Sequence, residues 1–313
     1  MKKSLTRKLT IAVIALVFAV VSLSTSTYAW FTMSNTAEVE EFTADVVAGQ
    51  GIEIAITKDG NSTNAPWYVG SVPKDDIQKL VNEGNSQITF KALTSNQTDL
   101  TGKFASTNVA KELFSDLEGN KSGGNDFIEF YIHIKTAQPG TVYLDKINLS
   151  SDNVNAWPVD KEYKKSNGET AQINDELTYN VADAVRVAII TEDGTATVFE
   201  NDVPAQPSYE TVQSNTSGTI NPNGAVSYYN SKNSLEDPNA IKNTTEKYPN
   251  AKQIKDLESN DLELGKYIAG SDDKEVVIRV LVWLEGWDAE CINAIFAQTL
   301  KTSFNFKYTA AAQ

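Results

Sequence analysis

Apolar and polar residues alternate along many short segments of this chain, so that every second side chain falls on the same face. This period of two is typical of a β-strand with one buried face, because successive side chains of a strand point to opposite sides. Long stretches with the 3.6-residue period of a helix are lacking. We predict strands at residues 51–57, 127–136, 141–149, 184–191, 195–199 and 302–308.

Turn residues divide these segments and predict two hairpins. Gln138 to Gly140 separates the second predicted strand from the third, and Glu192 to Gly194 separates the fourth from the fifth. Residues 275–285 (EVVIRVLVWLE) are apolar on both faces, as a central strand of two packed layers would be. Many short strands joined by turns predict an all-β fold, an antiparallel, jelly-roll-like β-sandwich.

Helices are predicted only as short decorations of the sheets, at residues 74–83, 110–117 and 289–300. Residues 201–250 differ from the rest, because they hold five of the nine prolines and nine asparagines. We interpret them as a loop-rich insertion in one sandwich domain made of residues 41–200 and 251–313. A small second domain is the alternative, although residues 225–229 (AVSYY) supply little material for a core.

The N-terminus has the three-part build of a secretory signal peptide. Residues 1–8 are basic, residues 9–21 form an apolar run, and residues 22–29 are small and polar. The run of 13 residues is shorter than the roughly 20 that span a membrane. We expect a signal peptidase to remove residues 1–29 by cutting between Ala29 and Trp30. An uncleaved signal anchor and a pilin-type leader are the alternatives.

Charge separates this leader from the remainder. The leader carries four basic residues and no acid, so the 23 basic and 41 acidic residues that follow give a net charge of -18. Such a chain is repelled by nucleic acid and by anionic membranes. The sequence also ends without a second apolar run, so we expect no stable membrane anchor after cleavage. We predict a secreted protein in the matrix or on the surface of a Gram-positive bacterium.

The single cysteine and single histidine argue against several enzyme classes. Cys291 excludes an intramolecular disulfide, and His133 excludes zinc sites with two or three imidazoles. We interpret His133 as a surface residue and Cys291 as a small buried one, since its acidic neighbours raise a thiol pKa. We expect no enzymatic activity. Paired carboxylates for glycoside hydrolysis stay open, although no local pattern marks a pair.

We expect no cofactor. Residues 151–153, 192–194 and 271–273 are clusters of acidic and small polar residues that could bind calcium through oxygen ligands. None has the spacing of a dedicated calcium loop, so we interpret them as solvated turns and leave calcium open.

The exported part contains only two arginines, and each interrupts an apolar strand. Arg186 stands in Val-Arg-Val and Arg279 in Ile-Arg-Val. A buried charge without a partner costs several kcal/mol. We therefore predict that each arginine pairs with a carboxylate, for which Glu129 and Glu285 are the candidates, or lies on an open face.

Two stretches resemble a known family. Residues 27–31 (TYAWF) close a leader similar to the SipW-type signal peptides of TasA/camelysin-like exported proteins of Gram-positive bacteria. Residues 282–291 (VWLEGWDAEC) resemble an element found in exported proteins with such leaders. The resemblance implies a jelly-roll subunit of an extracellular fibre in a biofilm matrix, and implies no matched proteolytic site.

In related fibres the N-terminal segment of one subunit completes the sheet of the next, so the partners implied are copies of the chain itself. Residues 30–40 suit this role, because apolar side chains alternate with polar ones. The alternative is an ordinary edge strand within its own subunit. The apolar residues of the donor-strand candidate are Phe31, Met33, Ala37 and Val39.

A second function stays open: a secreted adhesin or carbohydrate-binding sandwich. Aromatic side chains on its loops would serve as stacking platforms for sugars. The candidates are Trp67, Tyr68, Trp157, Tyr228 and Tyr229.

Overall fold

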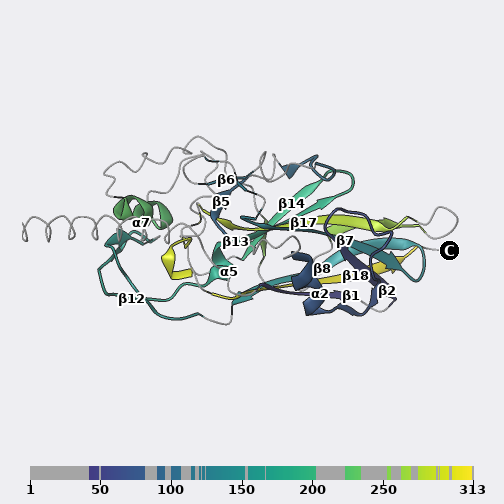
Figure 1. Ribbon diagram of the computed structural model, residues 1–313, viewed down its shortest axis with the longest axis horizontal. Helices are drawn as coiled ribbons and strands as arrows, with labels where there is room; N and C mark the ends of the chain where they lie inside the picture. The colour runs from purple at the N-terminus through teal and green to yellow at the C-terminus, as the bar shows by residue number, and fades with distance from the viewer. Residues whose placement is uncertain are drawn as a thin grey trace, which may run out of the picture. The chain divides into compact units, whose positions relative to one another are not determined.

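Figure 1 shows the computed structural model. It describes residues 42–48, 51–81, 90–95, 100–106, 114–116, 120, 122–123, 125–151, 154–165, 167–201, 223–233, 252–254, 262–268, 274–286, 288, 290–295 and 298–311. The predicted signal peptide (residues 1–29) and donor strand (residues 30–40) lie outside this part of the chain.

Strands dominate the described residues, and the helices are short. The strands are β1 (Phe42–Ala48), β2 (Ile52–Thr57), β3 (Tyr68–Val69), β4 (Ser71–Val72), β5 (Ala92–Thr94), β6 (Ser115–Asp116), β7 (Ile128–Thr136), β8 (Gly140–Ser151), β9 (Trp157–Pro158), β10 (Tyr163–Lys164), β11 (Thr170–Ala171), β12 (Glu176–Leu177), β13 (Val185–Thr191), β14 (Ala196–Asn201), β15 (Lys252–Ile254), β16 (Leu262–Tyr267), β17 (Val276–Glu285) and β18 (Leu300–Ala310). The helices are α2 (Lys74–Val81), α5 (Val181–Ala184), α7 (Ala225–Lys232) and the 3₁₀ helix η1 (Asn293–Ile295).

Two sheets form the body of the fold. The small sheet has the strand order β16-β8-β18-β1-β4, and the large sheet has the order β15-β14-β13-β17-β7-β2-β3, with β5 and β6 attached beside β17. Most neighbours are antiparallel, whereas β1–β18, β14–β15 and β5–β17 are parallel. Both sheets therefore combine strands from residues 41–200 (and Asn201) with strands from residues 251–313.

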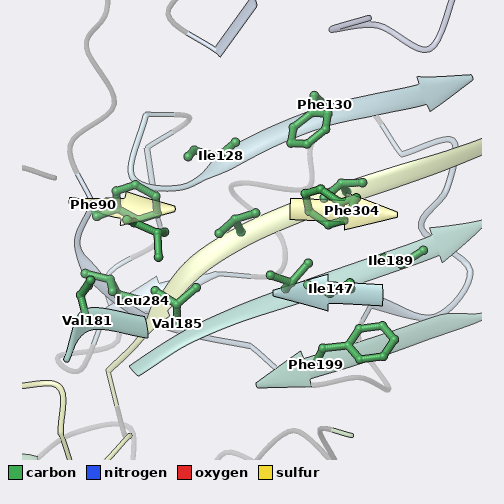
Figure 2. Packing of buried hydrophobic residues seen from close by; sticks show 14 of the residues in the cluster. Phe90, Ile128, Phe130, Ile147, Val181, Val185, Ile189, Phe199, Leu284 and Phe304 are labelled. Atoms are coloured by element: carbon green, nitrogen blue, oxygen red, sulfur yellow. The ribbon is translucent and has the colours of Figure 1, made fainter. Parts of the chain in front are cut away.

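The sheets pack face to face on one apolar core. Phe130 of the large sheet and Phe304 of the small sheet lie edge to face, with ring centroids 6.2 Å apart (Figure 2). Alternate residues of β2, β7, β8 and β18 line this core, as the period of two predicts. The fold is thus the predicted all-β sandwich.

The large sheet is buried on its second face as well. Trp283 and Leu281 point away from the sandwich core and pack with Phe114 and Phe127 in a second apolar cluster. All ten residues of β17 are consequently buried, which confirms the central strand predicted from its two apolar faces.

One predicted hairpin is confirmed and the other is wrong. β13 and β14 pair antiparallel across the turn that follows Thr191. β7 and β8, however, lie in different sheets: β7 pairs with β17 and β2, and β8 pairs with β18 and β16. The connection through Pro139 therefore crosses from one sheet to the other. The apolar faces of β7 and β8 line the same core from opposite sides.

The helix predictions succeed only in part. Residues 74–83 contain α2, whose Ile77 and Val81 are buried. Of residues 110–117, the described Ser115 and Asp116 form β6 instead, paired with β5. Among the described residues of 289–300, η1 is the only helix, and Leu300 already begins β18. At Ser115, Asp116 and Leu300, strand pairing with distant residues overrides the local helical pattern.

The insertion predicted at residues 201–250 requires two corrections. Asn201 belongs to β14, and residues 225–232 form α7 where we predicted loops. Tyr228 of α7 packs in the sandwich core cluster, so this helix does not found a separate core. Apart from Asn201 and residues 223–233, the insertion lies outside the described residues.

Candidate functional site

The residues predicted to act in export and strand donation cannot be placed, since they lie outside the described part of the chain. They are Ala29, Trp30, Phe31, Met33, Ala37 and Val39. The strand that follows them is described. β1 begins at Phe42, with only Glu41 between it and the donor-strand candidate.

The edge of β1 is only partly paired. β1 pairs with β18 along all seven residues, but on its other side β4 pairs only with Val46 and Val47. Among the described residues no strand pairs with this side of Phe42–Asp45. An unpaired strand edge offers main-chain donors and acceptors to another strand.

The large sheet has a similar edge on β2. β3 pairs there with only Glu53 and Ile54. β3 and β4 are joined by Gly70, whose φ of 92° is a conformation that glycine adopts without strain. The short segment β3–Gly70–β4 therefore links the two sheets. The described strands pair with only part of the β2 edge and part of the β1 edge.

Both arginines lie against the carboxylates proposed for them. Arg279 donates through Nε to Glu129 Oε1 over 2.6 Å, and through Nη1 to the carbonyl oxygen of Lys103 over 2.5 Å. Tyr131 OH donates to the carbonyl of Phe104 over 3.3 Å. Arg279 and Tyr131 thus hold the loop at residues 100–106 over the outer face of the large sheet.

Arg186 makes a fully buried pair with Glu285. Arg186 Nη1 lies 2.5 Å from Glu285 Oε2, with the side chains 1% and 0% exposed. Trp283 Nε1 donates to the same carboxylate oxygen over 3.3 Å. The element VWLEGWDAEC therefore supplies the buried anion that a strand arginine requires.

The described residues after Glu285 in this element are joined by short hydrogen-bonded turns. The amide of Asp288 donates to the carbonyl of Glu285 over 3.0 Å, and the amide of Glu290 donates to Asp288 Oδ1 over 2.9 Å. Cys291 is 8% exposed. Burial raises the pKa of its thiol, and the nearby Asp288 and Glu285 raise it further. Such a thiol is a poor nucleophile.

His133 is completely buried, so its interpretation as a surface residue is wrong. It is 0% exposed, because loop residues cover the outer face of the large sheet here. Nδ1 lies 2.9 Å from Glu275 Oε1, and Nε2 lies 2.8 Å from Thr57 Oγ1. Ser62 Oγ also donates to Glu275 Oε1, over 2.7 Å. The alternation of apolar and polar residues in β7 places His133 on the outer face but could not predict that this face is covered there.

The Thr57 hydroxyl, the His133 imidazole and the Glu275 carboxylate lie in a row, an arrangement that resembles a catalytic nucleophile with its general base. A nucleophile must reach a substrate, however, and Thr57 is 6% exposed. Its Oγ1 also accepts the amide hydrogen of Gly60 over 3.1 Å. The arrangement joins β2, β7 and the loop at residue 62, which is a structural role.

The described residues hold no group of three or more His, Cys, Asp or Glu side chains placed to bind a metal ion. Asp193 is a turn residue: its Oδ1 accepts from Thr191 Oγ1 over 2.5 Å and from the amide of Thr195 over 2.9 Å. These hydrogen bonds lower the pKa of Asp193. Asp152, Asn153 and residues 271–273 lie outside the described residues.

Four of the five aromatic candidates for sugar binding contact neighbouring side chains: Trp67, Tyr68, Trp157 and Tyr228. Tyr228 is 5% exposed and packs edge to face with Trp157, at 5.7 Å between ring centroids. Lys135 Nζ lies 4.4 Å from the centre of the Trp67 ring. Tyr68 donates its hydroxyl to Asp76 over 2.7 Å, and burial, with that carboxylate, raises the pKa of Tyr68 to about 12.

A search of protein-family models, curated proteins and solved structures found no match to this chain. In the described part of the chain, no helix combines the length and apolar character needed to cross a membrane.

Proposed function

We propose that this chain is a secreted structural subunit of an extracellular fibre or biofilm matrix, and that copies assemble by β-strand donation. The observation that carries the proposal is the half-paired edge of β1. The described strands leave Phe42–Asp45 unpaired on one side, in the sandwich that residues 30–40 directly precede.

The donor-strand candidate fits such an edge chemically. Its main chain would supply hydrogen bonds to the next subunit, and its alternating apolar residues would set the register. The resemblance of the leader to SipW-type signal peptides supports export and a fibre-forming role. The scarcity of His and Cys supports a role without catalysis.

Charge sets a condition on assembly. Subunits of charge -18 repel one another, so protonation of carboxylates or added cations should favour fibres. A subunit of this kind would assemble more readily at acidic than at neutral pH.

The decisive experiment compares the exported chain, beginning at Trp30, with a variant that lacks residues 30–40. Negative-stain microscopy should show fibres for the first and monomers for the second. A composition-matched variant exchanges Phe31 with Thr32 and Met33 with Ser34, which moves the apolar side chains to the other face. It should also fail to form fibres, whereas Phe31→Leu with Met33→Leu should assemble.

Fibre growth by the deletion variant would refute strand donation. A wild-type chain that stays monomeric over a wide range of concentration and pH would refute the fibre role itself. Binding of glycans by that monomer would favour the adhesin instead.

A further inference from the structure

Lys232 of α7 has a largely buried side chain that contacts a carboxyl group distant in the sequence. The side chain is 9% exposed, and Nζ forms an ion pair with Asp160 Oδ2, 72 positions earlier in the chain. Lysine is seldom buried to this extent, because its charge favours water. The lysines of four other ion pairs are 25–61% exposed: Lys91, Lys165, Lys274 and Lys307.

A phenol hydroxyl binds the other oxygen of the same carboxyl group. Tyr228 OH donates to Asp160 Oδ1 over 3.0 Å, and Tyr228 is 5% exposed. Burial and the adjacent Asp160 carboxylate raise the pKa of Tyr228, so its hydroxyl keeps the proton that it donates. The Asp160 carboxyl group therefore has an amino group at Oδ2 and a hydrogen-bond donor at Oδ1.

Aromatic packing holds these groups in place. The Tyr228 ring lies edge to face with Trp157 and Tyr163, at centroid distances of 5.7 Å and 5.3 Å. Lys232 Nζ lies 5.5 Å from the centre of the same Tyr228 ring. Two groups that are held together in contact react far faster than the same groups free in solution, because the entropy of bringing them together is already lost on folding.

We propose that Lys232 and Asp160 join covalently through an amide bond between their side chains. Within the pair a proton passes from the ammonium to the carboxylate, which gives the two neutral groups that a site poor in water favours. The amine nitrogen attacks the Asp160 carboxyl carbon, and the Tyr228 hydroxyl stabilises the negative charge that develops on Oδ1.

Atoms and charges balance without an oxidant or a co-reactant. The bond between Lys232 Nζ and the Asp160 carboxyl carbon forms, and the bond from that carbon to Oδ2 breaks. The Oδ2 hydroxyl takes one proton from the nitrogen and leaves as water, while Oδ1 returns to a carbonyl oxygen. The Asp160 side chain is 28% exposed, so this water has a path to solvent.

The amide bond ties α7 to the segment before β10. A chain with a single cysteine forms no intramolecular disulfide, whereas an amide supplies a crosslink that reducing agents do not break. By closing the chain between residues 160 and 232, it restricts the unfolded state as a disulfide does. The bond forms within one chain and does not depend on the proposed strand donation.

Mass spectrometry of the denatured chain beginning at Trp30 tests the proposal. The wild-type mass should be one water molecule below that of the sequence, and tryptic digestion should release a joined pair of peptides that contain Asp160 and Lys232. Lys232→Arg keeps a cation but has no primary amine, so it should show the full mass. Lys307→Arg, at an exposed ion pair, is the control and should keep the deficit.

Tyr228→Phe keeps the ring and removes the hydroxyl, so loss of water from freshly synthesised chains should slow by about 100-fold. Linkage of this variant at the wild-type rate would overturn the role given to the hydroxyl. A wild-type chain that is folded by circular dichroism and keeps the full mass of its sequence would overturn the crosslink itself. A deficit that persists in Lys232→Arg would also overturn it, because the water would then come from another residue. The joined peptides are read from the wild-type chain, so this test does not depend on the folding of the variants.

Discussion

Arg186 and Glu285 form an ion pair in which the guanidinium Nη1 and the carboxylate Oε2 are 2.5 Å apart and neither side chain is more than 1% exposed. The two residues lie on adjacent strands, β13 and β17, close to the second apolar cluster. A pair placed there is costly to break, because the remaining charge cannot reach water.

The first prediction concerns this pair. Glu285→Leu and Arg186→Met should each lower the free energy of unfolding by about 3–5 kcal/mol, since each leaves a buried charge. Arg186→Met combined with Glu285→Leu should cost less than the sum of the single changes. Urea denaturation of the four chains completes the double-mutant cycle.

The exposed pair Asp145–Lys307 serves as its control. Its side chains are 40% and 38% exposed, and Lys307 Nζ lies 3.0 Å from Asp145 Oδ1. Replacing either residue with alanine should change stability by less than about 1 kcal/mol. Equal losses at both pairs would contradict the assignment of a special cost to burial.

The second prediction concerns His133. His133→Leu removes the imidazole from Thr57 Oγ1 and from Glu275 Oε1, which keep the Gly60 amide and the Ser62 hydroxyl as donors. Stability should therefore fall by about 1–3 kcal/mol in total, the cost of one lost buried hydrogen-bonding partner. Thr57→Val should cost less, because Glu275 keeps its bond to the imidazole, and Thr57→Ser should cost least. Chemical denaturation ranks the three variants; a stable His133→Leu protein would show that the network contributes nothing.

The third prediction is a loss of stability in alkali. Burial is the largest cause that raises the pKa of Cys291, Tyr163, Tyr179 and Tyr228. The folded state then holds these protons more tightly than the unfolded state. Stability should be complete below the unfolded-state values, about 8.5 for Cys and 10 for Tyr, and should fall as pH rises above them.

Urea midpoints measured between pH 8 and pH 11 test this expectation, together with the phenolate absorbance of the folded protein. Cys291→Ala should remove the earliest part of the decline and leave the part due to tyrosine. A midpoint that rises with pH over this range would contradict the sign of the argument.

The fourth prediction concerns Gly140, where β8 begins. A Cβ built on Gly140 would lie 2.4 Å from the carbonyl oxygen of Thr309, a main-chain atom of the paired strand β18. Gly140→Ala should therefore destabilise the protein by about 1–3 kcal/mol through overpacking. Gly123→Ala is the control, since its nearest contact is 3.6 Å away. Thermal melting of both variants gives the comparison.

Much of the fold can be predicted from local pattern. The alternation over β2, β7, β8 and β18 gives both their existence and their inward faces, and the turn after Thr191 gives the hairpin of β13 and β14. The arginine partners can be predicted too, because a buried cation requires an anion and few apolar strands carry one.

Other features have no local signal. The turn before Gly140 is compatible with a hairpin or with an arch, and only the competition of β17, β2, β18 and β16 for the edges of β7 and β8 decides between them. α7 has eight residues, as the predicted α2 has, but its sequence AVSYYNSK lacks a clear helical spacing of apolar positions. It gains its stability from contacts with residues about 65 positions earlier, such as the hydrogen bond between Tyr228 and Asp160 at a separation of 68.

The sequence by itself determines that this chain is a β-sandwich, that residues 30–313 are strongly acidic and that its strand arginines need carboxylates. These properties follow from side-chain periodicity and charge, which are local or additive. Only the tertiary structure decides that His133 is buried, that the described strands leave one side of Phe42–Asp45 unpaired and that Tyr228 of α7 packs in the sandwich core cluster. Each of these features depends on tertiary contacts between segments that are distant in the sequence. The free energy of such a contact depends on both segments and cannot be read from either one alone.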